Sequence, residues 1–228
     1  MQNNVKVEAL IFDMDGTMIH SMPWHTKSWL VFAENHGLKI DMSDLLARTS
    51  GRTGAECMRL LFERDLTDAE CESLVHEKEA AYRDLFSEHF AEIAGFNAFA
   101  KAAVARGLKI AVGTAGDRHN IEFVMSRLKM NPLPLAIVGG DEGFTGKPTP
   151  AIFLEAARRI GADPARCIVF EDAPLGIEAA RRGGMRAVAV CSSHTPAELA
   201  GPHVIAAVRD YEELAQSHFL ETLDAATA

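Results

Sequence analysis

The sequence has few cysteines, and no two of them are closely spaced. The four thiols, Cys57, Cys71, Cys167 and Cys191, include no C-x-x-C pair. Free cysteine is among the most buried residue types, and disulfides are rare where the compartment is reducing. We therefore interpret the four cysteines as buried thiols of a protein in a reducing compartment.

Long apolar segments are missing as well. The longest apolar runs are far too short to span a bilayer, and no basic segment followed by a long apolar stretch opens the sequence. Low-complexity linkers and internal repeats are also absent. These features predict a soluble protein of the cytoplasm.

Basic residues are outnumbered by acidic ones. The chain has 23 lysines and arginines against 32 aspartates and glutamates, which gives a net charge of −9. Nucleic acids and anionic membranes attract basic surfaces, so we expect neither as a partner. An anionic ligand would have to be attracted by a local positive site.

What the chain does have is the pattern of a layered α/β protein. Residues 7–12 are almost continuously apolar, which is typical of a parallel strand buried on both faces. From about residue 95 onward, similar runs alternate with helical spacing, which predicts βαβ units and a doubly wound parallel sheet. The expected strands cover residues 7–12, 108–114, 135–138, 167–170 and 186–190, and the expected helices cover residues 96–106, 120–129, 151–160 and 175–182.

Residues 22–89 break this alternation. They contain no convincing strand, and Thr67-Asp68-Ala69-Glu70 has the capping-box pattern of a helix start. The 228 residues suit one domain, or one domain that carries an insertion. The simplest architecture is therefore an α-helical block inserted between the first strand and the rest of an α/β core.

Two carboxylates follow the first expected strand, in Asp13-Met14-Asp15-Gly16-Thr17. Ligands of doubly wound sheets bind beyond the carboxyl ends of the strands. Two carboxylates on an extended backbone could both face Mg²⁺, which takes a few oxygen ligands and keeps its own waters. A solvated turn uses the same residue types, so this segment alone leaves both interpretations open.

Three further polar segments follow expected strands or precede expected helices. Thr114, with the small Ala115 after it, could hold a phosphate through its hydroxyl and backbone N–H groups, or could only cap the strand end. Lys147 could be a fixed positive charge or an exposed loop lysine. The pair Glu171-Asp172 could supply a metal carboxylate or favour a helix N-terminus.

Taken together, these segments resemble the four motifs of the haloacid dehalogenase superfamily, in the same order and over essentially the whole chain. The helical insertion after the first motif is similar to that superfamily's small helical cap. Residues 12–17 and 169–180 resemble its β-phosphoglucomutase-like branch. The resemblance implies a Rossmann-like core at residues 1–20 and 91–228 and a helical cap domain at residues 21–90.

The resemblance also implies a Mg²⁺-dependent phosphatase that acts on a small phosphorylated metabolite. Asp13 would be the nucleophile that becomes a phosphoryl-aspartate. Asp15 would protonate the leaving oxygen and then activate water. The implied metal ligands are Asp13, the backbone carbonyl of Asp15, Asp172 and the neighbouring Glu171, and the implied phosphoryl contacts are Thr114, Ala115 and Lys147.

Residues of the cap would select the substrate. His25 aligns with a mutase histidine that couples cap closure to catalysis, and Lys78 aligns with a cap lysine that faces the mutase active site. A core histidine and a solvated helix lysine are the alternatives. The mutases also have an arginine for the second phosphate where this chain has Gly54, and Arg52 lies two residues earlier. The missing arginine favours hydrolysis, with a sugar phosphate as the expected substrate.

Three other functions stay open at this point. One is β-phosphoglucomutase, an isomerase. Another is an inorganic pyrophosphatase of the same branch, which has a similar Gly-Arg-Thr-Gly string but a glutamate where Ser50 stands here. The third is a binding or regulatory protein that keeps the fold without turnover. The sequence indicates no particular oligomeric state.

Overall fold

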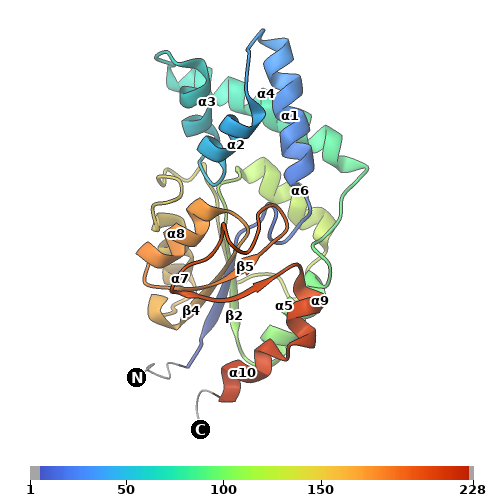
Figure 1. Cartoon of the computed structure of the whole chain (residues 1–228), viewed down its shortest axis with the longest axis vertical. Helices are drawn as coiled ribbons and strands as arrows, with labels where there is room; N and C mark the ends of the chain where they lie inside the picture. The colour runs from blue at the N-terminus through green and yellow to red at the C-terminus, as the bar shows by residue number, and fades with distance from the viewer. Residues whose placement is uncertain (1–5, 226–228) are drawn as a thin grey trace.

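The computed structural model describes residues 6–225 and has a sheet with helices around it and a group of helices beyond one end (Figure 1). The sheet has six strands in the order β3-β2-β1-β4-β5-β6, and every neighbouring pair is parallel. The strands are β1 (Ala9–Phe12), β2 (Lys109–Gly113), β3 (Ala136–Val138), β4 (Cys167–Glu171), β5 (Arg186–Val190) and β6 (Val204–Val208).

Helices cover both faces of this sheet. Successive strand residues point to opposite faces, so Leu10 and Phe12 of β1 pack in one core and Ala9 and Ile11 in the other. The predicted doubly wound α/β class is therefore confirmed. The first core also holds side chains of α5 (Phe96–Ala105), α6 (Arg118–Leu128), α9 (Tyr211–Gln216) and α10 (Phe219–Ala225), and the second holds those of α7 (Ala151–Arg159) and α8 (Pro174–Arg182).

The expected helical insertion is also present. Its four helices lie beyond one end of the sheet (Figure 1), and we call them the cap. They are α1 (Met22–Asn35), α2 (Met42–Thr49), α3 (Gly54–Phe62) and α4 (Asp68–Ser87). They have an apolar core of their own, which includes Trp29, Phe32 and Met58. The predicted capping box forms at the start of α4. None of the helices in the described part of the chain has the length and apolarity that crossing a bilayer requires.

Candidate active site

The candidate active site lies at the carboxyl ends of the central strands, where the cap meets the sheet. In the observed order, the chain proceeds from β1 to β2 and β3 on one side and from β4 to β5 and β6 on the other. The topological switch point therefore falls between β1 and β4, which is where doubly wound sheets bind ligands. Asp13 directly follows β1, and Asp172 directly follows β4. One pocket, formed by core and cap together, is lined by both residues.

Lys147 lies between two carboxylates at the base of this pocket. Its Nζ is 2.5 Å from Asp13 Oδ1 and 2.6 Å from Glu171 Oε1, and the residue is only 1% exposed. Burial alone would lower the pKa of Lys147, but the charges of Asp13 and Glu171 raise it above its usual value, so the ammonium stays charged. The alternative of an exposed loop lysine is wrong.

The site has more buried carboxylates than cations. Burial, with the charges of Glu171 and Asp172, raises the pKa of Asp13 well above its usual value, although Lys147 opposes the rise. Burial and the charge of Glu171 raise the pKa of Asp172 to about 8. Burial is the main cause of both shifts, and the three neighbouring acids add to it because Lys147 balances them with a single positive charge. A second cation would let these groups ionise near neutral pH.

The turn after Asp13 is built against Asp172. Gly16 has a φ of 76°, and a Cβ at this position would lie 2.2 Å from Asp172 Oδ2, so only glycine fits. Thr17 Oγ1 donates a 3.4 Å hydrogen bond to Asp172 Oδ1, and Ser193 Oγ donates to Oδ2. Asp13 and Asp172 are both buried. The alternative of a solvated turn is therefore wrong.

These residues fit the expected cation. Within residues 6–225, no group of three or more His, Cys, Asp and Glu side chains is arranged as a metal site. The expected Mg²⁺ set needs only two side-chain carboxylates, Asp13 and Asp172, because its third protein ligand is the backbone carbonyl of Asp15. Glu171 is already engaged, since its oxygens accept from Lys147 Nζ and from the backbone N–H of Ala173 at 2.7 Å. The surplus negative charge beside oxygen donors suits a divalent cation.

The side chain of Asp15 is turned toward the cap. Its Oδ1 accepts hydrogen bonds from Ser21 Oγ at 2.7 Å and Tyr82 OH at 3.1 Å, and His25 Nε2 lies 3.1 Å away. Burial would raise the pKa of Asp15, but the charge of His25 and these hydrogen bonds lower it to about 2. In this arrangement Asp15 is a carboxylate, the form that accepts a proton. Ser21 is the N-cap residue of α1, yet it makes no side-chain capping bond, because its hydroxyl is used by Asp15.

The expected phosphate contacts line the same pocket. Thr114 follows β2 and is buried, and its Oγ1 accepts a hydrogen bond from the backbone N–H of Gly116 at 3.0 Å. This leaves the hydroxyl hydrogen of Thr114 for a ligand. Ala115 and Gly116 line the same pocket.

The expected cap residues reach the pocket as well. His25 stacks on Tyr82 with ring centroids 3.7 Å apart, and its Nδ1 lies 2.8 Å from Lys78 Nζ. Lys78 is 2% exposed, so the solvated-lysine alternative is wrong. Arg52 also lines the pocket, and its Nε donates to the carbonyl of Arg48 at 2.7 Å. The structure thus brings every site residue expected from the sequence to one pocket.

Several side chains in and around this pocket were not expected from the sequence. Tyr82 is four residues after Lys78, so its place on the same face of a helix could have been inferred. Glu79 and Asn120 line the pocket, and Ser193 holds Asp172. No local pattern distinguishes these three, because each acquires its neighbours through contacts between distant segments.

Comparisons with known proteins agree with this geometry. The model of the haloacid dehalogenase-like hydrolase family matches residues 7–184. The chain is 33% identical over 182 residues to the fructose-1-phosphate phosphatase YqaB of Escherichia coli (strain K12), and this match covers 80% of the chain and 95% of that protein. It is 32% identical over 191 residues to the β-phosphoglucomutase of Bacillus subtilis (strain 168), with 81% and 83% covered.

Solved structures show the same relationship. A hydrolase from Pseudomonas syringae superposes with a TM-score of 0.82 at 25% identity, covering 93% of this chain and 98% of that one. The family match includes β1 through α8, and therefore the whole cap and all four motif segments. On this evidence, the chain belongs to the haloacid dehalogenase-like hydrolase family.

Proposed function

We propose that this protein is a Mg²⁺-dependent phosphatase that transfers the phosphoryl group of a small phosphate ester first to Asp13 and then to water. The observation that carries the proposal is the contact of Asp13 with the buried Lys147, at the base of a pocket that Thr114 and the cap also line. A relative named for fructose 1-phosphate supports sugar phosphates as the substrate class.

In the first step, Asp13 attacks the phosphorus, and a carboxylate nucleophile divides one difficult hydrolysis into two easier steps. Lys147, the Thr114 hydroxyl and the backbone N–H of Ala115 would neutralise charge on the transferring group, and all three residues line the pocket. A Mg²⁺ ion held by Asp13, the backbone carbonyl of Asp15 and Asp172 would supply further neutralisation, which an anionic nucleophile needs to approach a phosphate.

Asp15 is the proposed acid and base. As a carboxylate it accepts a proton from the water that cleaves the phosphoryl-aspartate, and in its protonated form it donates to the leaving oxygen. His25 and Tyr82 lie on cap helices, and Ser21 is the N-cap residue of the first of them, α1. The pKa of Asp15 is therefore tied to the position of the cap.

We also propose the division of the chain into a core, residues 1–20 and 91–228, and a cap, residues 21–90. Residues 1–5 and 226–228, at the two ends of the chain, belong to the proposed core but lie outside the described residues. His25, Arg52 and Lys78 are proposed to contact the non-transferred part of the substrate from the cap. A cytoplasmic location stays a prediction from the sequence.

The second candidate is β-phosphoglucomutase, which the relative in Bacillus subtilis favours. A mutase must hold two phosphates. A side chain at position 54 would require Val75 of α4 to shift, because a Cβ there would lie 2.8 Å from Val75 Cγ1. Arg52 lines the pocket and would have to hold the second phosphate instead.

A panel of phosphate esters assayed with Mg²⁺ tests both candidates. We expect phosphate release, with the highest kcat/KM for a sugar monophosphate. Conversion of a 1-phosphohexose to a 6-phosphohexose without phosphate release would favour the mutase. A complete lack of phosphate release and of isomerisation across the panel would reject enzymatic turnover.

A further inference from the structure

Asn120, on α6 of the core, holds cap helix α4 by both ends of its side-chain amide. Its Nδ2 donates to Glu79 Oε2 at 2.7 Å, and its Oδ1 accepts from Arg83 Nη1 at 2.8 Å. Glu79 and Arg83 are four residues apart on α4, so they lie on one face of that helix. Asn120 is 1% exposed. We call these two hydrogen bonds the latch.

Further polar contacts connect the latch to Asp15, the proposed acid and base. Glu79 Oε1 accepts from Lys78 Nζ at 2.8 Å, Lys78 Nζ lies 2.8 Å from His25 Nδ1, and His25 Nε2 lies 3.1 Å from Asp15 Oδ1. A continuous series of polar contacts therefore leaves the core at Asp15, crosses the cap and returns to the core at Asn120. Moving the cap away from the core would break this series at its two ends, between His25 and Asp15 and between Glu79 and Asn120.

The charges on both sides make the latch stronger than a neutral pair of hydrogen bonds. Burial alone would raise the pKa of Glu79, but the charge of Lys78 and the neighbouring hydrogen bonds lower it, so Glu79 is ionised. The Asn120 amide thus donates to an anion and accepts from the Arg83 cation, and such charge-assisted bonds are about twice as strong as neutral ones. Separating α4 from α6 would break both bonds and leave the buried Asn120 amide without these partners.

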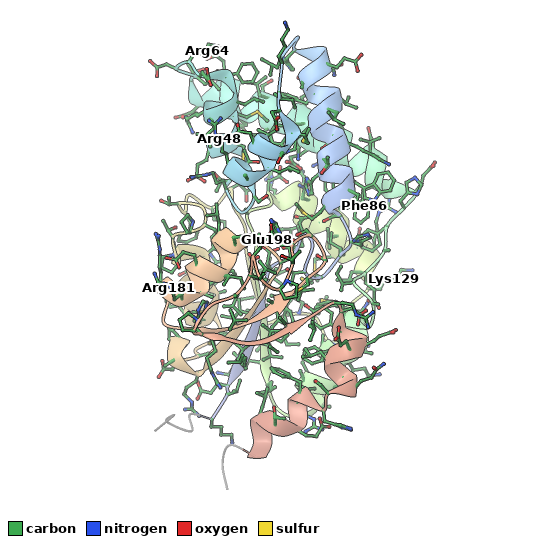
Figure 2. The ribbon with its side chains drawn as sticks, in the orientation of Figure 1. Arg48, Arg64, Phe86, Lys129, Arg181 and Glu198 are labelled. Atoms are coloured by element: carbon green, nitrogen blue, oxygen red, sulfur yellow. The ribbon has the colours of Figure 1, made fainter. Side chains whose placement is uncertain are left out.

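A second contact between the same helices serves as a comparison. At the far end of α4, Arg127 of α6 donates to the backbone and side-chain oxygens of Ser87 at 3.1 and 2.7 Å, and this contact is exposed. Phe86 lies close to this junction of the cap with α6 (Figure 2), and its ring centroid is 6.1 Å from that of Phe123. The exposed contact holds the same helices together, but it has no polar connection to Asp15.

We propose that Asn120 is a positioning residue that latches the cap closed over the pocket and thereby keeps His25 against Asp15 during turnover. This inference rests on the proposed function for its catalytic consequence, because the latch itself touches neither Asp13 nor the expected phosphoryl contacts. Opening of the latch would admit water and release the substrate.

Kinetics of latch variants test the catalytic consequence. Asn120→Ala should lower kcat/KM on the order of 10- to 100-fold, since two hydrogen bonds to charged side chains are lost. Ser87→Ala is the matched control and should leave kcat/KM unchanged. Asn120→Asp alone places a second carboxylate against Glu79, whereas combined with Glu79→Gln it restores a hydrogen bond with the donor on the cap. The kcat/KM of the double variant, relative to the unsubstituted protein, should therefore be higher than the product of the relative kcat/KM values of the two single variants. Unchanged kcat/KM in Asn120→Ala, or single effects that simply multiply, would overturn the proposal.

Thiol labelling tests cap opening without any substrate. Cys57 lines the pocket, and burial raises the pKa of its thiol to about 12, so the closed protein should react slowly with iodoacetamide. Cys57 and Cys71 are both buried in the cap core, but Cys71 does not line the pocket and is therefore the internal reference. In Asn120→Ala, peptide mass spectrometry should show on the order of tenfold faster labelling of Cys57 and unchanged labelling of Cys71.

Two labelling results would contradict the latch. Equal labelling of Cys57 with and without the substitution means that the cap does not open more often. Equal acceleration of Cys57 and Cys71 means that the cap unfolds instead of opening. Should the unsubstituted protein release no phosphate from any ester, the proposed function fails, while the labelling experiment still decides whether Asn120 holds the cap.

Discussion

Replacing Lys147 with methionine would remove the ammonium group that contacts the carboxylates of Asp13 and Glu171. Methionine has a similar length and no charge, so the substitution removes the contacts with Asp13 Oδ1 and Glu171 Oε1 while it fills most of the space. Removing one partner of a buried ion pair costs about 3–5 kcal/mol. For a protein of this size about 1 kcal/mol corresponds to 2–4 °C, so we expect Tm without Mg²⁺ to fall by roughly 6–20 °C.

The loss of stability in Lys147→Met should depend on pH, and the direction of this dependence follows from the pKa values of the carboxyl groups. Lys147 lowers the pKa of Asp13, which burial raises, so its removal raises that pKa further. A group whose pKa is higher in the folded than in the unfolded state stabilises the fold at low pH, and this contribution is lost as pH rises toward the folded pKa. The deficit of Lys147→Met should therefore be small near pH 5 and large near pH 8.

Thermal unfolding in EDTA at these two pH values measures the effect. The double variant Lys147→Met with Glu171→Gln should recover part of the loss at pH 8, since one of the unbalanced carboxylates is gone. Lys101→Met, at an exposed position of α5, is the matched control and should leave Tm unchanged. The reasoning is refuted if Lys147→Met unfolds at the original temperature at pH 8, or if its deficit is equal at both pH values.

Three more outcomes follow from the same geometry. Burial raises the pKa of Asp172 to about 8, so the free energy of unfolding in EDTA should decrease as the pH rises from 5 to 8. Mg²⁺ should make this decrease smaller, and an equal decrease with Mg²⁺ would argue against a cation beside Asp172. Tyr82→Phe removes one donor to Asp15 and should raise the pKa of Asp15. The basic limb of the kcat/KM profile, where Asp15 has lost the proton that it donates to the leaving oxygen, should therefore move to higher pH by about half a unit to one unit, and an unmoved limb would mean that Asp15 does not set it. Ser193→Ala frees one oxygen of Asp172 and should raise the Mg²⁺ concentration for half-maximal activity by about tenfold, whereas a change in kcat alone would contradict this role.

The central strands and the acidic turn could be predicted because local sequence determines them. β1 is apolar at every position because helices cover both faces of the sheet, so all of its side chains are buried. The motif segments that follow β1, β2 and β4 had to converge, since parallel strands end at the same edge. The position of Asp172 beside Asp13 is a direct consequence of the pairing between β1 and β4.

The edge of the sheet and the interior of the cap could not be predicted in this way. β6 pairs only with β5, and Ile205 within it is 42% exposed, so it lacks the fully buried pattern of the central strands β1 and β4. α9 and α10 are short and follow it. The contact of Glu79 with Asn120 joins two helices from different parts of the fold. It depends on how the cap packs on the core, which no local periodicity records.

The most direct test of the account is to look for the phosphoryl group on Asp13. The protein would be mixed with a sugar monophosphate and Mg²⁺, quenched with acid during turnover, digested and analysed by mass spectrometry, beside Asp13→Asn treated identically. We predict a phosphorylated peptide in which the modified residue is Asp13, and a folded Asp13→Asn protein with neither label nor turnover. A phosphoryl group on a different residue, or appreciable turnover by Asp13→Asn, would contradict the account.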